Sequence, residues 1–401
     1  MQDQRLQGAT ILQVIPSLDT GGAENTTVEV SAAIVRAGGR SIVVSHGGRL
    51  TDRIRKDGGF VIEMPVHSKN PIAIARNALR IAGLIREHNI DLVHARSRAP
   101  AWSALAATRI GDKPFVTTYH GAYAAQSAIK KFYNSSMVRA DTVIANSQFT
   151  ADAITAQFNG SLAPKELVVI PRGADVSRFS PAAVSPKRRM ALIEKWGVSQ
   201  RDPEYIALLP ARLSGWKGHM TILTTLDALR RRISDGKLVD GDGKALQVIF
   251  AGDADPKSEF AASIARRIDD LGLNHVVKMV GYCADMPAAY SVSDVVLVPS
   301  TRPEAFGRTV VEAGAMGKIV LASDHGGARE TVDDGVSGFL LAPGDANAWA
   351  EQLRRVMNLS LDSKKTLENQ ALSRVRANFS IAAMCTSTIS VYQKLLMGCI
   401  D

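Results

Sequence analysis

Short apolar runs alternate with amphipathic stretches through the first 170 residues of the chain. The apolar runs are rich in β-branched residues and are bounded by turn-forming residues, a pattern that predicts buried strands. Most of the stretches between them have helical periodicity, and this alternation is typical of a parallel, doubly wound sheet. We predict strands at 10–16, 41–45, 61–64, 91–95, 115–119, 142–145 and 167–170.

The same alternation returns in the second half of the chain. Residues 173–203 interrupt it with several prolines and a basic cluster, so we expect them to connect two domains. Because 401 residues are too many for one ordinary core, we place the domains at 1–172 and 204–378, with a helical tail at 379–401. In the second domain we predict strands at 205–209, 247–251, 276–280, 295–298, 319–322 and 339–341.

Composition narrows the class of protein. A hydrophobic content of 46% and a charged content of 22% are those of a soluble globular protein. No apolar run approaches 18 residues and the first residues lack the features of a signal peptide, so we expect neither a membrane span nor a leader, and a cytoplasmic location. Cys283, Cys385 and Cys399 have no metal-ligand spacing, which fits free thiols in a reducing compartment.

The net charge of +9 is concentrated in the first half of the chain. Residues 1–172 carry 20 Lys and Arg against 13 Asp and Glu, whereas the remainder carries 28 against 26. Aromatic residues make up only 5% of the chain and are not interleaved with the basic ones, which argues against a nucleic-acid surface. Three interpretations stay open: an anionic membrane, an acidic acceptor, or ordinary solvated charge.

An amphipathic segment at 71–88 is the candidate for a membrane contact. Arg76, Arg80 and Glu87 mark a polar stripe on an otherwise apolar helix, and Lys130 and Lys131 could contribute. Such a stripe is also typical of the solvent face of a helix that packs on a core.

The stretch 294–317 has the pattern of a buried strand, a polar loop and a helix start. In open α/β sheets, ligands bind at the carboxyl ends of strands, and the free amides of a helix start attract anions. Glu304 and Glu312 could each accept hydrogen bonds from hydroxyls. Between them, phosphates could lie over the amides of Phe306, Gly307 and Arg308. A competing interpretation is a capping box at 309–312, in which Glu312 only satisfies backbone donors.

Three more loops with candidate chemistry follow predicted strands. The Gly21-Gly22 turn would let backbone amides approach a phosphate, although glycines mostly turn chains for steric reasons. His120 could donate to a sugar hydroxyl, although a structural role is common for a single histidine. Arg212 and Lys217 could neutralise a diphosphate, although such side chains on loops are usually solvated.

Two of these motifs resemble a known enzyme family. E-A-F-G-R-T-V-V-E at 304–312 and R-L-S-G-W-K-G at 212–218 resemble the signatures of retaining glycosyltransferases of family 4, and the resemblance covers most of the chain. It implies the GT-B fold, an α/β architecture of two Rossmann-like, doubly wound parallel-sheet domains that face each other across a cleft. The family's last helix, here within 379–401, crosses back to the first domain.

The resemblance also implies roles for the candidate residues. Glu312 would bind the ribose diol of the donor, Glu304 the hydroxyls of the transferred sugar, and His120 would lie against that sugar. The diphosphate would be held by Arg212, Lys217 and the amides of Gly21, Gly22, Phe306, Gly307 and Arg308. No nucleophile is evident, so attack by the acceptor from the face of the leaving group is an expectation from the family. Arg172 stands where many members have Asn and receives no role.

We therefore expect a metal-independent hexosyltransferase. Its donor would be a UDP- or GDP-linked hexose, and its acceptor a glycan, either lipid-linked or a lipopolysaccharide core. The alternatives are a nucleotide-sugar epimerase of the same fold and a non-catalytic glycan-assembly protein. Asp253-Ala254-Asp255 resembles a metal-binding motif of other glycosyltransferases, but we interpret it as a turn. No dinucleotide-binding, phosphate-loop or H-E-x-x-H fingerprint is present.

Overall fold

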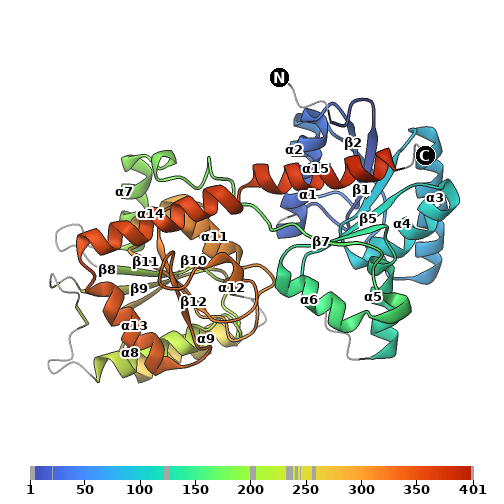
Figure 1. Ribbon diagram of the computed structural model, residues 1–401. Coiled ribbons are helices and arrows are strands. Elements are labelled where there is room, and N and C mark those ends of the chain that lie inside the picture. Colours follow the sequence, from blue (N-terminus) through green and yellow to red (C-terminus); the bar gives the residue numbers. More distant parts are fainter. Residues whose placement is uncertain are drawn as a thin grey trace. The chain divides into compact units, whose positions relative to one another are not determined.

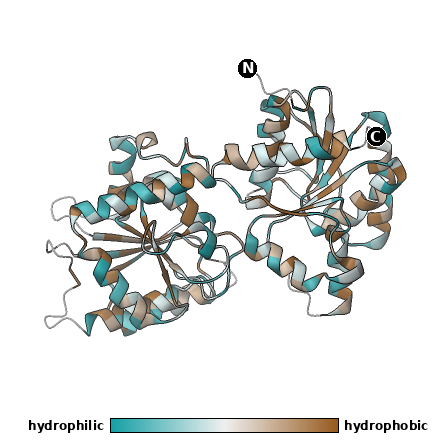
Figure 2. Ribbon diagram, in the orientation of Figure 1, coloured by the Kyte–Doolittle hydropathy of each residue, from teal (hydrophilic) through white to brown (hydrophobic). Residues whose placement is uncertain are grey.

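The protein folds into two compact α/β units (Figure 1). Unit 1 comprises the described parts of Met1–Arg172 and Ile381–Asp401, and unit 2 those of Gly173–Ser380. The computed structural model describes residues 5–19, 21–121, 127–198, 205–231, 238–239, 243, 245–254 and 259–398. In both units the strands are predominantly hydrophobic and the helices carry both polar and apolar residues (Figure 2).

Unit 1 is built on a parallel sheet in the order β3-β2-β1-β4-β5-β6-β7. The predicted strands of this half are confirmed, with ends that differ by at most two residues. The order reverses beside β1, which pairs with β2 on one side and β4 on the other. The strands are β1 (Thr10–Val14), β2 (Arg40–Ser45), β3 (Phe60–Glu63), β4 (Leu92–Ala95), β5 (Phe115–Tyr119), β6 (Thr142–Ala145) and β7 (Leu167–Val169).

Helices cover both faces of this sheet because successive side chains of each strand point to opposite faces. Ile11 of β1 packs with Val30 and Ile389 on one face, under α1 and α15. The next residue, Leu12, packs with Ile81 on the other face, under α3. The helices are α1 (Gly22–Arg36), α2 (Thr51–Lys56), α3 (Pro71–Glu87), α4 (Arg98–Gly111), α5 (Ala128–Val138), α6 (Gln148–Gln157) and α15 (Ile381–Met397), with a 3₁₀ turn η1 (Gly160–Leu162).

A buried polar network fixes α15, drawn red in Figure 1, to the sheet of unit 1. The Tyr392 hydroxyl lies 2.6 Å from His94 Nδ1, and Thr118 Oγ1 lies 2.7 Å from His94 Nε2. Arg96 donates to Gln13 Oε1 at 2.6 and 2.9 Å and to the Tyr392 hydroxyl at 3.5 Å. Burial and the nearby Arg96 hold the pKa of His94 well below its ordinary value. Both ring nitrogens of His94 are thus occupied, which makes this histidine structural.

Unit 2 is built on a second parallel sheet, in the order β10-β9-β8-β11-β12-β13. The predicted strands of the second half are also confirmed, within one residue at each end. The strands are β8 (Tyr205–Leu209), β9 (Leu246–Ala251), β10 (Val277–Gly281), β11 (Val295–Val298), β12 (Ile319–Ser323) and β13 (Phe339–Leu341). The helices are α7 (Pro186–Trp196), α8 (His219–Arg230), α9 (Phe260–Asp270), α10 (Met286–Val292), α11 (Arg308–Ala315), α12 (Ala328–Thr331), α13 (Ala346–Met357) and α14 (Leu361–Asn378), with a 3₁₀ turn η2 (Pro181–Ala183).

The described part of the expected connection, residues 173–198, belongs to unit 2. Pro186, one of the prolines that suggested a linker, begins α7 at a position where no helical N–H is needed. Leu192, Ile193 and Trp196 of this helix are buried in the core of unit 2. The remaining part of the expected connection, 199–203, lies outside the described residues.

Composition led us to expect free thiols and no membrane span, and the structure gives observations on both. Cys283 and Cys385 are buried free thiols, and Cys399 lies outside the described residues. Across the parts of the chain that the structure describes, no helix is both long and apolar enough to cross a membrane.

Candidate active site

The loops after β8 and β11 meet at the carboxyl edge of the sheet of unit 2. These two strands are neighbours, so their ends lie side by side. The Thr301 amide donates to the Trp216 carbonyl at 2.8 Å, which ties the loops together. Gly218 has φ +79°, and a Cβ there would lie only 1.8 Å from the Pro299 carbonyl oxygen. The approach of the two backbones therefore requires glycine at this position.

Lys217 and Glu304, one from each loop, form an ion pair at this edge. Lys217 Nζ lies 2.8 Å from Glu304 Oε1, and the two side chains are only 18% and 16% exposed. The Ser300 hydroxyl donates to the same oxygen, and the ammonium also lies 4.2 Å from the centre of the Trp216 ring. Glu304 Oε2 has no hydrogen bond to any residue that the structure describes. The lysine has two further N–H donors, so both partners can still bind a ligand.

Glu312 is the second carboxylate of this edge. Arg308 Nε donates to Glu312 Oε1 at 2.7 Å, and the Tyr290 hydroxyl donates to Oε2 at 3.2 Å. Burial, together with the Glu312 carboxylate, raises the pKa of Tyr290 well above its ordinary value, so the hydroxyl stays protonated. The residue before the first turn of α11 is Gly307, and no side-chain cap is formed. The capping-box interpretation of Glu312 is therefore wrong, because Thr309 lies inside the helix.

A pair of glycines after β12 supports the loop that carries Glu304. The Gly327 amide donates to the Glu304 carbonyl at 2.8 Å. A Cβ on Gly326 would lie 2.4 Å from that carbonyl oxygen, and one on Gly327 would lie 2.4 Å from Phe306 Cα. The Phe306 side chain is buried against Phe379, with ring centres 5.9 Å apart.

This packing orients the amides of Phe306 and Gly307, which form no hydrogen bond within the described part of the chain. Our sequence interpretation did not include Gly326 and Gly327. The available signal was a glycine pair in the loop that follows a predicted strand, as at Gly21-Gly22.

Arg212 lies in the same loop as Lys217 but is exposed, and Glu304 and Glu312 pair with Lys217 and Arg308 instead. Its neighbour Leu213 forms a parallel bridge with Ala254, and the Leu213 amide donates to the Asp253 carbonyl at 2.9 Å. Asp255, the second carboxylate of the motif that we interpreted as a turn, lies outside the described residues. Within the described ranges, no three His, Cys, Asp or Glu side chains are grouped closely enough to hold a metal ion.

The candidate residues of the first half meet at the carboxyl edge of the sheet of unit 1. Gly21 precedes the first turn of α1, and a Cβ there would lie 2.1 Å from Glu24 Oε2. A Cβ on Gly22 would lie 2.3 Å from Arg172 Nη1. Arg172 Nη2 in turn lies 2.6 Å from His120 Nδ1. The space beside the two glycines is thus occupied by the side chains of Glu24 and Arg172. Arg172, to which the sequence assigned no role, lies against both Gly22 and His120.

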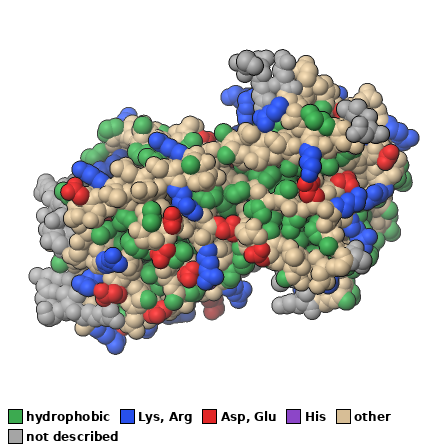
Figure 3. Space-filling view, viewed as in Figure 1, with side chains coloured by type: hydrophobic (Ala, Val, Ile, Leu, Met, Phe, Trp, Pro, Cys, Tyr) green, Lys and Arg blue, Asp and Glu red, His purple; other side chains and the backbone are tan. Residues whose placement is uncertain are grey.

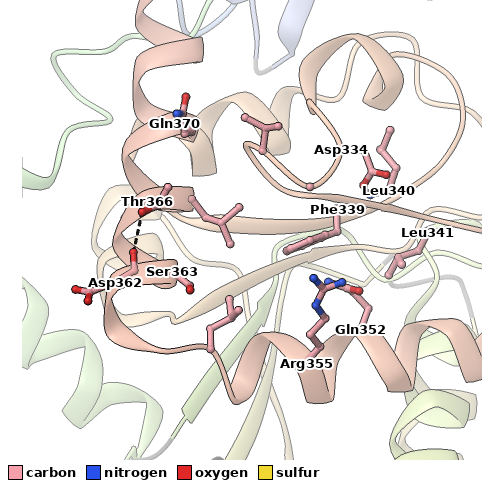
Figure 4. Close-up of a pocket in the computed structure, with 14 residues that line it drawn as sticks. Asp334, Phe339, Leu340, Leu341, Gln352, Arg355, Asp362, Ser363, Thr366 and Gln370 are labelled. Carbon is pink, nitrogen blue, oxygen red and sulfur yellow. Dashed lines mark hydrogen bonds between the residues drawn. The ribbon is translucent and has the colours of Figure 1, made fainter.

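A groove elsewhere in unit 2 is lined by none of the candidate site residues. It has a volume of about 740 Å³ and is bounded by β13, α13 and α14 (Figure 4). Phe339 and Arg355 line it, together with the segments that precede β13 and follow α13. Those segments enter β13 and leave α13 at the amino edge of the sheet, away from the carboxyl edge where Glu304 lies.

Comparison with known proteins relates the two units to described families. The model described as "Glycosyltransferase Family 4" matches residues 20–178, and "Glycosyl transferases group 1" matches 193–374. A GDP-mannose-dependent alpha-(1-6)-phosphatidylinositol monomannoside mannosyltransferase of Mycolicibacterium smegmatis is 31% identical over 68% of each chain. A D-inositol 3-phosphate glycosyltransferase of Salinispora arenicola is 28% identical over 64% of this chain and 55% of its own length.

Solved structures are similar over nearly the whole chain. A glycosyltransferase from Rickettsia africae has a TM-score of 0.86 and 34% identity, covering 97% of this chain and 99% of that one. HepE of Anabaena in complex with UDP-glucose has a TM-score of 0.76 and 24% identity, covering 96% and 99%. With the two parallel sheets, these likenesses confirm the predicted GT-B fold.

The packing of Gly327 against Phe306 can be tested through stability. Gly327→Ala places a Cβ against backbone atoms that cannot rotate away, so we expect the free energy of unfolding to fall by about 1–3 kcal/mol. The measurement is urea unfolding followed by circular dichroism. Gly215→Ala is the matched control, because its Cβ would have no neighbour nearer than 4.0 Å, and it should change stability by no more than about 0.5 kcal/mol. Equal stability of the two variants would contradict the packing argument.

Proposed function

Because this chain belongs to glycosyltransferase family 4 and is a glycosyltransferase, we propose that it moves a hexose from a UDP- or GDP-hexose to an acceptor hydroxyl with retention of configuration. One observation carries the proposal. Glu304 lies in the loop before α11 and Glu312 lies in α11 itself, each held by a cation and each with acceptor sites left over. Two oriented carboxylates of this kind suit a ligand with two sets of hydroxyls, as a nucleotide sugar has.

Glu312 is the proposed ligand of the ribose. An ionised carboxylate has about four lone-pair sites, and Arg308 and Tyr290 use two of them. The remaining two suit a vicinal diol. Glu304 is the proposed ligand of the hexose hydroxyls, through the oxygen that Lys217 and Ser300 leave open.

Leaving-group stabilisation is the proposed source of catalysis. Lys217, the exposed Arg212 and the amides of Phe306 and Gly307 would offset the charge that develops on the departing diphosphate. The acceptor hydroxyl would attack from the same face as the leaving group and lose its proton to the departing phosphate. In unit 1, the groups that we propose to contact substrate are His120 and the amides of Gly21 and Gly22.

Two similar proteins with named donors support a GDP- or UDP-linked hexose. The Mycolicibacterium relative is GDP-mannose-dependent, whereas HepE binds UDP-glucose. We propose that the acceptor is a glycan, either lipid-linked or a lipopolysaccharide core, because unit 1 contains most of the net positive charge.

A basic and apolar surface on unit 1, formed by α3 and α5, supports a contact with anionic lipid. On α3, the exposed face carries Ile72 and Leu79, 79% and 67% exposed, beside Arg76 and Arg80. Large apolar side chains exposed beside cations on one helix face suit an interfacial contact. Figure 3 shows Lys and Arg among hydrophobic side chains on this side of unit 1.

On α5, Ile129 and Phe132 are 82% and 64% exposed beside Lys130 and Lys131. Phe132 stacks on Trp102 of α4 with ring centres 5.1 Å apart, and α4 also packs on α3, so the three helices lie on the same face of the sheet. Apolar side chains beside cations are the combination that binds the interface of an anionic bilayer.

Nucleotide binding is the first prediction for this function. The nucleotide of the true donor, at about 100 times its dissociation constant, should stabilise the protein by about 2.7 kcal/mol. We would record thermal unfolding with UDP, GDP and their hexose conjugates, with and without EDTA. The shift should survive EDTA and disappear in Glu312→Ala, while Glu351→Ala, in an exposed ion pair of α13, should keep it. No shift with any nucleotide would favour a non-catalytic assembly protein.

Turnover provides the second prediction. Lys217→Ala and Arg212→Ala should each lower kcat by roughly 10²-fold, because each removes a charge that stabilises the leaving group. Arg354→Ala removes a surface cation of the same unit and should leave kcat unchanged. The measurement is nucleoside diphosphate release with and without acceptor. Unchanged kcat in both loop variants would exclude this mechanism, and a new sugar formed from the donor alone would indicate an epimerase.

Lipid binding gives the third prediction. The double variant Ile72→Ser/Leu79→Ser should lose most cosedimentation with vesicles of phosphatidylglycerol and phosphatidylcholine, since both apolar anchors are removed. Binding should also weaken with salt and be absent for pure phosphatidylcholine. Ile110→Ser, at a 59% exposed site near the end of α4, is the control. Equal binding by the double variant and the control would contradict this surface.

A further inference from the structure

Three elements of unit 1 bring Gly22, His120 and Arg172 together at the carboxyl edge of its sheet. Gly22 begins α1, His120 directly follows β5, and Arg172 lies three residues after the end of β7. The guanidinium of Arg172 lies between the other two. Nη2 is 2.6 Å from His120 Nδ1, and a Cβ on Gly22 would lie only 2.3 Å from Nη1. A side chain at position 22 would therefore displace the guanidinium from its present place.

The contact between Arg172 and His120 determines which ring nitrogen is protonated. A guanidinium has only N–H donors, so His120 Nδ1 must be the acceptor and cannot carry a proton. A neutral imidazole in this contact therefore carries its proton on Nε2. Burial, and then the charge of Arg172, lower the pKa of His120 well below its ordinary value. The ring stays neutral at physiological pH.

The Nε2–H group of His120 is then a donor that lacks an acceptor. Nε2 is buried and has no hydrogen-bond partner among the residues that the structure describes. A buried donor without a partner costs about 1–3 kcal/mol, and such a group is usually satisfied by a ligand or by water. Its position at the carboxyl edge of a parallel sheet is where ligands of such sheets bind.

We propose that Arg172 is a positioning residue that keeps His120 in the neutral Nε2–H form, ready to donate one hydrogen bond to a substrate oxygen. The oxygen is either a hexose hydroxyl or a phosphoryl oxygen, since both accept such a bond. The substrate's identity rests on the proposed function, but the protonation state of the ring does not. Arg172 itself acts only through His120.

The decisive experiment is nuclear magnetic resonance of the free protein labelled with ¹⁵N-histidine. Long-range ¹H–¹⁵N correlations report which ring nitrogen carries the proton, and His120→Gln assigns the signal. We expect the Nε2–H form at pH 8 and still at pH 6.5, because burial and Arg172 lower the pKa of the ring below its ordinary value near 6.5. Arg172→Met should allow protonation of Nδ1 and move the titration to higher pH, whereas Arg172→Lys, which retains a donor, should restore the native pattern.

Two further variants test whether a changed His120 signal in Arg172→Met comes from misfolding. Gly22→Ala should displace the guanidinium and change the His120 signal in the same way as Arg172→Met. Lys165→Met removes a cation paired with Asp141 on the surface of unit 1 and should leave the signal unchanged. A native protein with the proton on Nδ1, or an unchanged signal in both Arg172→Met and Gly22→Ala, overturns the proposal.

Ligand titrations and kinetics complete the test. A change of the His120 signal with UDP or GDP alone would assign the phosphoryl oxygen, and a change only with UDP-glucose or GDP-mannose would assign the hexose hydroxyl. No change with any of them would exclude the hydrogen bond to substrate. In turnover, Arg172→Met should lower kcat roughly tenfold or more with little change in KM. If the native protein shows the Nε2–H form but transfers no hexose, the proposed function fails and the assignment of the ring stands.

Discussion

Backbone packing at the carboxyl edge of unit 2 is the constraint on which the candidate site depends. Gly218 lies against Pro299, Gly326 against Glu304 and Gly327 against Phe306, and each approach leaves no room for a Cβ. The loops that carry Lys217 and Glu304 can therefore be close enough for their side chains to pair. The contacts of Gly326 and Gly327 also support the loop that carries Glu304, so the amides of Phe306 and Gly307 are oriented before any ligand binds.

The charges of unit 2 depend on that geometry. Glu304 and Glu312 each have a cation and a hydroxyl as partners, so neither carboxylate is buried without compensation. A carboxylate taken out of water without such partners would cost several kcal/mol. The cation and the hydroxyl beside each carboxylate offset this cost at a site that is partly shielded from water. Each carboxylate still has acceptor sites that can bind hydroxyl groups.

In unit 1 the space beside a glycine is also occupied by another part of the chain, here a side chain. Gly22 has no Cβ, and the space is filled by the guanidinium of Arg172, which orders His120. At β4 of the same sheet, α15 contributes Tyr392 to a network with His94 and Arg96. The last helix of the chain therefore completes the core of the unit that contains the first strand.

The sequence by itself determined the strands, the fold class and the family, because buried parallel strands are local apolar runs and the motif around Glu304 and Glu312 is contiguous. It also placed Lys217 in a loop that follows a strand. Only the tertiary structure decided that Pro186 begins a core helix, that Gly327 supports Phe306, and that Arg172 contacts His120. These contacts join residues that lie far apart in the chain, and no local pattern of polarity specifies which distant side chain will fill the space beside a glycine.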